Sequence, residues 1–408
     1  MGTTKYYAVA IIALLLATFM LSSCELSSRG PDEKGLIRTA TFEGGTAYRT
    51  ADDIYWVLDL KGTWREMGRQ YGALVKADLK AFYTEITSDL ERRGMSLEDQ
   101  LIVARGLSGD LSAGLNDLMD GMVETSGLTS DEIRLLNVGI FNLSGVLLEA
   151  ESNDACSGIG AWGAYAPGGK LVFGRNWDMM RDGMLGYMRY LSVAVFHPDE
   201  GIAYANVHPL GNVYMETGIN ERGLFLELNN GMYSDLSTFE DRESSVSVLA
   251  DALTRCGTID EAAEYLAGIP AEAAYIIQLA DLDRAVSVER ATFDCRVREG
   301  DENGLLVAYN SFVPPYPGTW EGKVTPARED DGRYDNLVSL ARSERFYGKL
   351  DAAAMKELMD IEFKDGGAVH KGTVLQVVAV PEDLCLWVRG YKFSDWQMVD
   401  LRALFADE

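Results

Sequence analysis

The chain changes its character at Cys156, and this change limits the folds that it can adopt. Before that residue, apolar side chains recur at threes and fours, which predicts helices over about 64–86, 97–122 and 131–149, after one strand at 54–60. After it, short apolar runs alternate with Gly and Pro, which predicts strands, and pairs of helices separate the strand clusters. This pattern predicts an α+β domain built in layers.

The first 24 residues are typical of an export signal and are excluded from the fold. Lys5 gives a short positive region, and the apolar run that follows is too short for a comfortable transmembrane span. The run ends in Leu-Ser-Ser-Cys at Cys24, which is typical of the lipobox of bacterial lipoproteins. An uncleaved signal anchor with a chance cysteine is the alternative. We therefore expect an exported lipoprotein, anchored to the membrane through lipidated Cys24 and facing the periplasm or the cell surface, with residues 25–50 as a polar tether.

The composition excludes several classes of partner. The formal net charge is −26, and Lys and Arg form no cluster, which excludes a nucleic-acid partner. Export would place the cysteines after Cys24 in an oxidising compartment, where Cys256 and Cys295 could pair, but their wide spacing is not that of a disulfide scaffold. Neither the cysteines nor the three histidines have the spacing of zinc ligands, so we expect no metal and no cofactor.

Cys156 is the candidate nucleophile because it stands at the head of a stretch of small residues before a predicted strand. A thiol nucleophile needs a base, yet the histidines His197, His208 and His370 lie in no recognisable cysteine-protease signature. A cysteine freed at a chain terminus needs no histidine, since its own α-amine, with an unperturbed pKa of about 7.7–8.0, can accept the thiol proton. Two alternatives stay open: a buried structural cysteine, and a conventional peptidase that uses one of the histidines.

Several motifs, taken together, resemble a known family. In chain order they are Lys61–Leu74 with its Gly-x-x-x-x-x-Gly-x-x-x-Gly pattern, Ala155–Ser157, Gly169–Asp178, Gly218–Leu224, Leu228–Asn230 and Val307–Ser311. Each motif is weak alone. Their order and spacing over about residues 55–390 resemble the isopenicillin N acyltransferase-like family of Ntn (N-terminal nucleophile) hydrolases. Bile-salt hydrolase, penicillin V acylase, acid ceramidase and acylethanolamine amidases are related to that family.

The resemblance implies that Cys156 attacks the carbonyl of Ala155, cuts the chain there and then acts as an N-terminal nucleophile. Arg175 matches the family arginine whose charge favours the thiolate. Asp178 matches the carboxylate that orients the new α-amine. For Arg175 and Asp178 the alternative is a surface ion pair at a strand end. Asn310 matches the oxyanion-hole asparagine, although a Tyr precedes it here where many relatives have Thr.

Four further residues are matched less sharply. Asn229 or Asn230 matches the second polar donor of the family site, and the sequence does not choose between them, because asparagines are also common turn formers. Arg342 and Arg345 resemble a family arginine on a similar helix. A solvated helix face is the alternative for both arginines.

The resemblance also implies the fold and the reaction. The fold would be a four-layer αββα sandwich, with two antiparallel sheets between helical layers. Self-cleavage would separate a mostly helical segment, 51–155, from the catalytic segment, 156–408. Trp162 and Trp177 could line an acyl pocket, although aromatic clusters are more often plain core.

The expected reaction is hydrolysis of the amide carbon–nitrogen bond of a small N-acyl substrate through a thioester at the nucleophile. Candidate substrates are N-acyl amino acids or amines, acyl-homoserine lactones, β-lactams with acyl side chains, and cell-wall peptides. Acyl transfer is less favoured, since acyl-coenzyme A is a cytosolic donor and the chain is expected to leave the cytosol. Ester hydrolysis of the phospholipase-B-like kind also stays open, as does a non-catalytic binding lipoprotein on the same scaffold.

Overall fold

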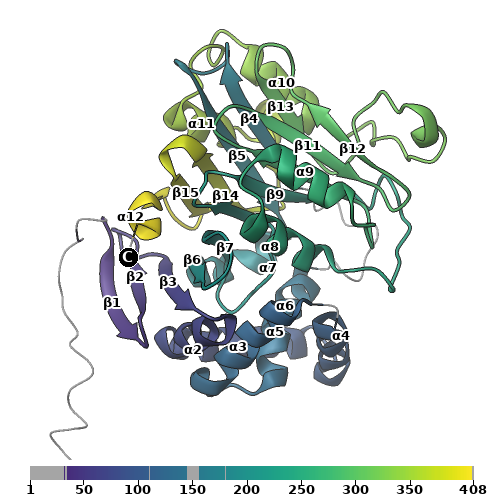
Figure 1. Ribbon diagram of the computed structural model, residues 1–408. Helices are drawn as coiled ribbons and strands as arrows, with labels where there is room; N and C mark the ends of the chain where they lie inside the picture. Colours follow the sequence, from purple (N-terminus) through teal and green to yellow (C-terminus); the bar gives the residue numbers. More distant parts are fainter. Residues whose placement is uncertain (1–31, 33–34, 110, 145–155, 180, 407–408) are drawn as a thin grey trace, which may run out of the picture.

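The computed structural model describes residues 32, 35–109, 111–144, 156–179 and 181–406. Two β-sheets are stacked on each other, and helices cover the outer faces of the stack (Figure 1). One hydrophobic core fills the space between the sheets and extends into the N-terminal helices. A second core lies between the smaller sheet and the helices that cover it. The predicted α+β layered fold is confirmed.

The larger sheet has ten strands and the smaller has six. In spatial order the larger sheet contains β1 (Ile37–Phe42), β2 (Gly45–Arg49), β3 (Trp56–Gly62), β6 (Leu191–Pro198), β7 (Tyr204–Pro209), β8 (Thr217–Asn220), β9 (Phe225–Asn230), β10 (Tyr275–Ala280), β11 (Ala285–Arg290) and β12 (Cys295–Glu299). The smaller sheet contains β13 (Leu305–Ala308), β4 (Ser157–Gly163), β5 (Gly169–Asp178), β14 (Thr373–Val380), β15 (Cys385–Gly390) and β16 (Gln397–Asp400).

The N-terminal strands differ from what the sequence indicated. Strands β1 and β2 lie within the stretch 25–50 that was expected to be a tether, and with β3 they form a meander at the edge of the larger sheet. The expectation of fully antiparallel sheets also needs one correction, because β3 pairs with β6 in parallel. Parallel neighbours require a long crossover, and here the N-terminal helices together with β4 and β5 supply it.

The helices form the outer layers of the sandwich. Helices α10 and α11 cover the smaller sheet, α8 and α9 cover the larger one, and α2 packs on the strands of the N-terminal meander. Their bounds are α2 (Trp64–Leu74), α3 (Lys76–Arg92), α4 (Leu97–Gly109), α5 (Ala113–Ser126), α6 (Ser130–Ser144), α7 (Arg181–Met184), α8 (Ser245–Arg255), α9 (Ile259–Ala267), α10 (Arg333–Arg342), α11 (Ala352–Met359) and α12 (Arg402–Phe405). The helices predicted over 64–86 and 97–122 are each divided in two.

Two glycines of α2 explain part of the N-terminal motif. Gly68 lies against α5, where an added Cβ would come within 2.0 Å of the carbonyl oxygen of Leu118. Gly72 lies one turn further along, where an added Cβ would come within 2.6 Å of the carbonyl oxygen of Met122. The Gly-x-x-x-Gly spacing therefore places both glycines on one helix face and lets the backbones of α2 and α5 approach closely.

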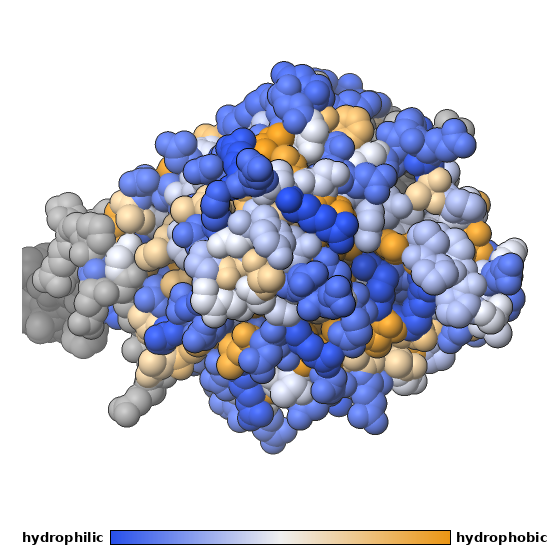
Figure 2. Space-filling view, turned by 90° about the horizontal axis from the view of Figure 1, so that it is seen from above, coloured by the Kyte–Doolittle hydropathy of each residue, from blue (hydrophilic) through white to orange (hydrophobic). Residues whose placement is uncertain are grey.

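Some predicted features lie outside the described residues, namely the export signal at 1–24 with Cys24, and the expected cleavage position at Ala155. In the described part of the chain, no helix is long and apolar enough to cross a membrane. The same part contains no group of three or more His, Cys, Asp or Glu residues that could hold a metal ion. Cys256 and Cys295 are free thiols. The face seen from above is mostly hydrophilic, with hydrophobic residues in small separate patches (Figure 2).

Candidate active site

Cys156 lies immediately before β4, in the interior of the smaller sheet. Strand β4 pairs antiparallel with β5, with Ser157 opposite Asn176 and Gly158 opposite Arg175. This register brings the end of β5, with Arg175 and Asp178, beside the nucleophile. The two residues thus come together with Cys156 as the resemblance implied, and both are buried, at 1% and 2% exposed, which excludes the surface ion pair.

Arg175 connects the nucleophile to the larger sheet. Its Nη2 lies 3.8 Å from the Cys156 Sγ and donates to the carbonyl oxygen of Leu228 at 2.8 Å, while its Nη1 donates to the carbonyl oxygen of Glu216 at 2.5 Å. Its Nε forms an ion pair with Glu227 Oε2 at 3.0 Å. These contacts fix the guanidinium in the space between the two sheets, where it faces the thiol.

Burial favours the protonated form of the Cys156 thiol. Burial raises its pKa to about 12, although Arg175 and a backbone hydrogen bond with Asp178 act to lower it. A thiol is a poor nucleophile until it loses its proton. The site therefore needs a base within reach of Sγ.

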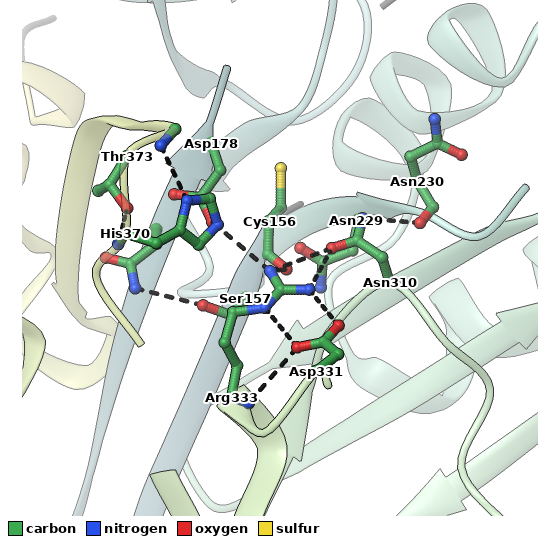
Figure 3. Close-up of polar contacts among 12 residues, drawn as sticks. Cys156, Ser157, Asp178, Asn229, Asn230, Asn310, Asp331, Arg333, His370 and Thr373 are labelled. Atoms are coloured by element: carbon green, nitrogen blue, oxygen red, sulfur yellow. Dashed lines mark hydrogen bonds and ion pairs between the residues drawn. The ribbon is translucent and has the colours of Figure 1, made fainter. Parts of the chain in front are cut away.

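Asp178 stands at the end of β5, beside Cys156 (Figure 3). Its Oδ2 lies 3.6 Å from Arg333 Nη1 and 3.2 Å from His370 Nε2. Its Oδ1 is buried and accepts no hydrogen bond from any residue that the structure describes. Burying a carboxylate oxygen without a hydrogen-bond donor costs free energy. A donor placed next to Cys156 would therefore form a favourable hydrogen bond with Oδ1.

Arg333, which the sequence analysis missed, reaches the nucleophile from the first turn of α10. Its Nη1 donates to the Cys156 carbonyl oxygen at 3.1 Å, and both terminal nitrogens lie 3.5 Å from Asn310 Oδ1. Asp331 holds the guanidinium through two contacts, Nε–Oδ1 at 2.8 Å and Nη2–Oδ2 at 2.6 Å.

Arg342 and Arg345 lie outside the site. Arg342 pairs with Asp301 and Arg345 with Glu357, and their side chains are 57% and 60% exposed. Nine residues separate Arg333 from Arg342 on α10, which is a rise of about 14 Å at 1.5 Å per residue. The assignment of these two arginines to substrate binding is therefore corrected.

The two tryptophans are placed very differently. Trp162 lies at the far end of β4, about 20 Å along the strand from the nucleophile at 3.3 Å per residue, and its ring packs on Gly300. It does not line the site. Trp177 is buried next to Asp178 on β5, with its ring edge-on to His208 at 5.5 Å between centroids.

Strand alternation distinguishes Asn229 from Asn230. Glu227 contacts the space around Gly158 of β4, so Glu227 and Asn229 face the smaller sheet while Asn230 faces away. Asn229 is buried, and its Nδ2 donates to Glu227 Oε1 at 2.8 Å. Asn230 contributes its backbone oxygen, which accepts from Asn310 Nδ2 at 2.8 Å. Of the two side chains, that of Asn229 is on the side of the nucleophile.

The histidines do not form a base for the thiol. The Nδ1 of His370 accepts a hydrogen bond from the backbone amide of Gly372 at 2.8 Å, and its Nε2 faces Asp178. Both ring nitrogens thus contact groups other than Sγ. His197 pairs with Asp59 on β3, and His208 faces Glu216. This arrangement disfavours the conventional cysteine-peptidase alternative.

Comparison with known protein families agrees with this geometry. Residues 165–365 match the family described as acyl-coenzyme A:6-aminopenicillanic acid acyl-transferase. This match agrees with the resemblance predicted from the sequence. The matched region carries Arg175, Asp178, Asn229, Asn310 and Arg333, and Cys156 lies just before it. A comparison with curated proteins finds no match.

Solved structures of Ntn enzymes are among those similar to this chain. An N-acylethanolamine-hydrolyzing acid amidase ortholog from Caenorhabditis elegans is 19% identical, with a TM-score of 0.43, over 55% of this chain and 93% of that one. A mutant form of the conjugated bile acid hydrolase from Clostridium perfringens is 13% identical, with a TM-score of 0.43, over 62% and 95%. Penicillin V acylase from Agrobacterium tumefaciens is 12% identical, with a TM-score of 0.34, over 60% and 86%.

Glu227, like Arg333, lies in the matched region 165–365 and was not identified from the sequence. Burial raises its pKa to about 7, against the opposing effect of Arg175. A sequence signal did exist, because Glu227 and Asn229 are polar residues that alternate with the apolar residues Leu226 and Leu228 of the same strand. Polar residues on the buried face of a strand are unusual and often functional.

Proposed function

We propose that the chain is a self-processing cysteine Ntn hydrolase that cleaves the amide bond of small N-acyl substrates through Cys156. The observation that carries this proposal is the position of Asp178. Its buried Oδ1 lacks a donor among the described residues, and it belongs to the residue that adjoins Cys156 at the end of β5. An α-amine created at Cys156 would supply that donor.

The self-cleavage step begins with attack of the Cys156 sulfur on the carbonyl carbon of Ala155. The carbon–sulfur bond forms, the carbon–nitrogen bond breaks, and the proton of the thiol moves to the nitrogen that becomes the α-amine. Water then hydrolyses the thioester, which releases Ala155 as a carboxylate and regenerates the thiol. Cys156 is left as a chain terminus that carries its own base.

In substrate turnover the freed α-amine takes the proton of the thiol, while Asp178 orients the amine and Arg175 favours the thiolate. Attack on the amide gives a tetrahedral oxyanion, which Asn229 and Asn310 stabilise through amide N–H groups. Each side-chain NH₂ has two N–H donors, so one remains for the oxyanion while the other keeps its contact with Glu227 or with the Asn230 backbone. The amine leaves with a proton, and water hydrolyses the thioester.

Acyl transfer to a second amine is the alternative, and the description of the matched family favours it. The two outcomes share the thioester and differ in the acceptor that resolves it. Adding a primary amine such as hydroxylamine to a turnover reaction would distinguish them by mass spectrometry. A hydrolase gives mainly the free acid at millimolar acceptor, and a transferase gives mainly the acyl-amine product.

Export is part of the proposal. The lipobox-like end of the leader at Cys24 supports a membrane-anchored lipoprotein at the periplasmic or outer face of the cell. Labelling of growing cells with an alkyne fatty acid, for wild type and Cys24→Ala, tests this directly. Lipid label on the wild type alone supports it, and label on neither protein contradicts it.

The decisive experiment is intact mass with N-terminal sequencing of protein expressed without residues 1–24. Wild type is expected to give two fragments, the second of which starts at Cys156, and Cys156→Ala is expected to give one uncut chain. Cys256→Ala is the matched control, since this cysteine is also buried but lies far along the chain after α8, and it should still be cut. A wild-type chain that stays uncut and does not hydrolyse acyl amides would overturn the proposal.

A further inference from the structure

Arg175 links Glu216 to the nucleophile, because its guanidinium contacts both residues. The backbone oxygen of Glu216 accepts from the same guanidinium that contacts the Cys156 Sγ, at 2.5 Å and 3.8 Å respectively. The segment before β8 that carries Glu216 is held in place by Asn137 of α6. The Oδ1 of Asn137 accepts a hydrogen bond from the backbone amide of Val213 at 2.8 Å, and its Nδ2 donates to the carbonyl oxygen of Gly211 at 3.1 Å. Glu216 is thus a fixed neighbour of the reacting sulfur.

The carboxylate of Glu216 pairs with no arginine or lysine among the described residues, whereas Glu227 and Asp331 each pair with an arginine. Arg175 pairs with Glu227, and Arg333 pairs with Asp331. Within the described residues, the basic group in ion-pair range of Glu216 is His208, at 3.6 Å between Nε2 and Oε2. Oε2 is buried and makes no hydrogen bond with any described residue, and the same holds for both ring nitrogens of His208.

These polar atoms are enclosed by aromatic walls. The His208 ring is 5.5 Å from that of Trp177 and 6.1 Å from that of Phe141, and Phe141 stacks on Tyr214 at 5.3 Å. The side chain of His208 is 3% exposed, whereas that of Glu216 is 17% exposed and so can meet solvent or a ligand. The unpaired polar groups therefore lie among aromatic rings, and the carboxylate side chain of Glu216 is the more exposed of the two.

The charge of Glu216 reaches the reacting groups. Burial is the main cause of the raised pKa of Cys156 and of Glu227, and Glu216 adds to the increase in both. It also contributes to the raised pKa of Tyr214, after burial, and of Tyr275. A ligand group beside the nucleophile would experience the same negative potential.

We propose that Glu216 and His208 form the subsite for the amine portion of the substrate and select amines that carry a hydroxyl or ammonium group over amines that carry a carboxylate. This inference rests on the proposed amide hydrolysis. The acyl carbon becomes bonded to sulfur and the amine departs, so we assign the charged group to the amine side of the scissile bond. An ammonium or hydroxyl can donate to the partly exposed carboxylate of Glu216, whereas a carboxylate would be repelled.

The test compares three probes that share one dodecanoyl chain and differ in the amine: 1,2-diaminoethane, propylamine and glycine. Each is assayed with the self-cleaved protein by measuring release of dodecanoic acid. Wild type is expected to prefer the cationic probe over the anionic one by about tenfold to hundredfold in kcat/KM, since the charges are close but partly screened. Glu216→Gln is expected to reduce that ratio to within threefold of unity. Because the ratio compares two probes on one protein, any effect of Glu216 on the thiol that all probes share cancels.

The matched control is Glu221→Gln, which removes the same charge from an exposed turn at the other end of β8 and should keep the wild-type ratio. Glu216→Asp keeps the charge and should keep the direction of the preference, which guards against loss of fold in Glu216→Gln. An unchanged ratio in Glu216→Gln would overturn the subsite while the hydrolase stands. Absence of hydrolysis of all three probes by the wild type would instead overturn the proposed function.

Discussion

Arg175 and Glu227 form an ion pair across the space between the two sheets, with both side chains at most 1% exposed. Buried ion pairs of this kind are expensive, because both charges lose their hydration. The pKa of Glu227, raised to about 7 by burial, indicates that the loss of hydration outweighs the attraction of Arg175. The carboxyl group of Glu227 therefore stays protonated to a higher pH than an ordinary Glu does.

This relationship makes a prediction about stability. The pKa of Glu227 is higher in the folded chain than the ordinary 4.5, so its contribution to the free energy of unfolding is full below pH 4.5 and is lost as the pH rises to about 7. Glu227→Gln lacks this loss. Its melting temperature should therefore rise relative to wild type between pH 5 and pH 7.5, by the equivalent of up to about 3 kcal/mol. Thermal unfolding of both proteins across this range measures it, and a variant that becomes relatively less stable would show that the ion pair dominates.

Asp178→Asn should separate the two reactions of the site. The α-amine exists only after cleavage, so its orientation by Asp178 matters for substrate turnover more than for cutting the chain. Turnover is expected to fall about a hundredfold or more, as for loss of a positioned general base, with a smaller effect on the cutting rate. Asp199→Asn, at an exposed turn after β6, is the control. Equal losses in both rates would contradict the role given to Asp178.

Arg333→Met should reduce chain cleavage by about tenfold to a thousandfold, because it removes the donor to the Cys156 carbonyl oxygen and takes a positive charge away from Asp178 and Asp331. Arg342→Met is the matched control on the same helix, where the side chain is 57% exposed and pairs with Asp301. The rate at which the cut fragments appear on a gel compares them. If Arg342→Met is the more impaired variant, the assignment within α10 is wrong.

Gly68→Ala should destabilise the protein by about 1–3 kcal/mol or more, since the new methyl group would collide with the backbone of α5. Gly106→Ala is the contrasting variant, because Gly106 lies in α4 with nothing near an added Cβ. That change should stabilise the protein by about 0.5–1 kcal/mol. Chemical denaturation of both variants measures the change in the free energy of unfolding, which should have opposite signs. Destabilisation of both would indicate that α4 is packed more tightly than the structure shows.

Much of the layered architecture could be predicted from the sequence, because apolar periodicity reports local structure. Long-range pairing was less accessible. Strands β1 and β2 were missed because polar residues and glycines interrupt the apolar residues of Ile37–Arg49, although four of the five residues of β2 are buried. The division of the helix at Val75 was missed because apolar residues continue on both sides of the break. The parallel pairing of β3 with β6 joins residues more than 130 positions apart, which no local pattern encodes.

In the site, too, residues close together in the sequence could be predicted, and contacts between distant residues could not. Cys156, Arg175 and Asp178 were found because they lie close together along the chain and match a motif. Arg333 was missed because its contact with Cys156 spans 177 positions. The choice between Asn229 and Asn230 required the orientation of β9, which the structure supplies through Glu227.

The parallel pairing of β3 with β6 has a consequence for the molecule after scission. The cut before Cys156 would leave β3 on one polypeptide and β6 on the other, hydrogen-bonded in the middle of one continuous sheet. The product would be an obligate pair of chains rather than an enzyme with a discarded leader. Refolding would then become a second-order process, so recovery after denaturation should depend on protein concentration, whereas uncut Cys156→Ala should recover at a rate independent of dilution.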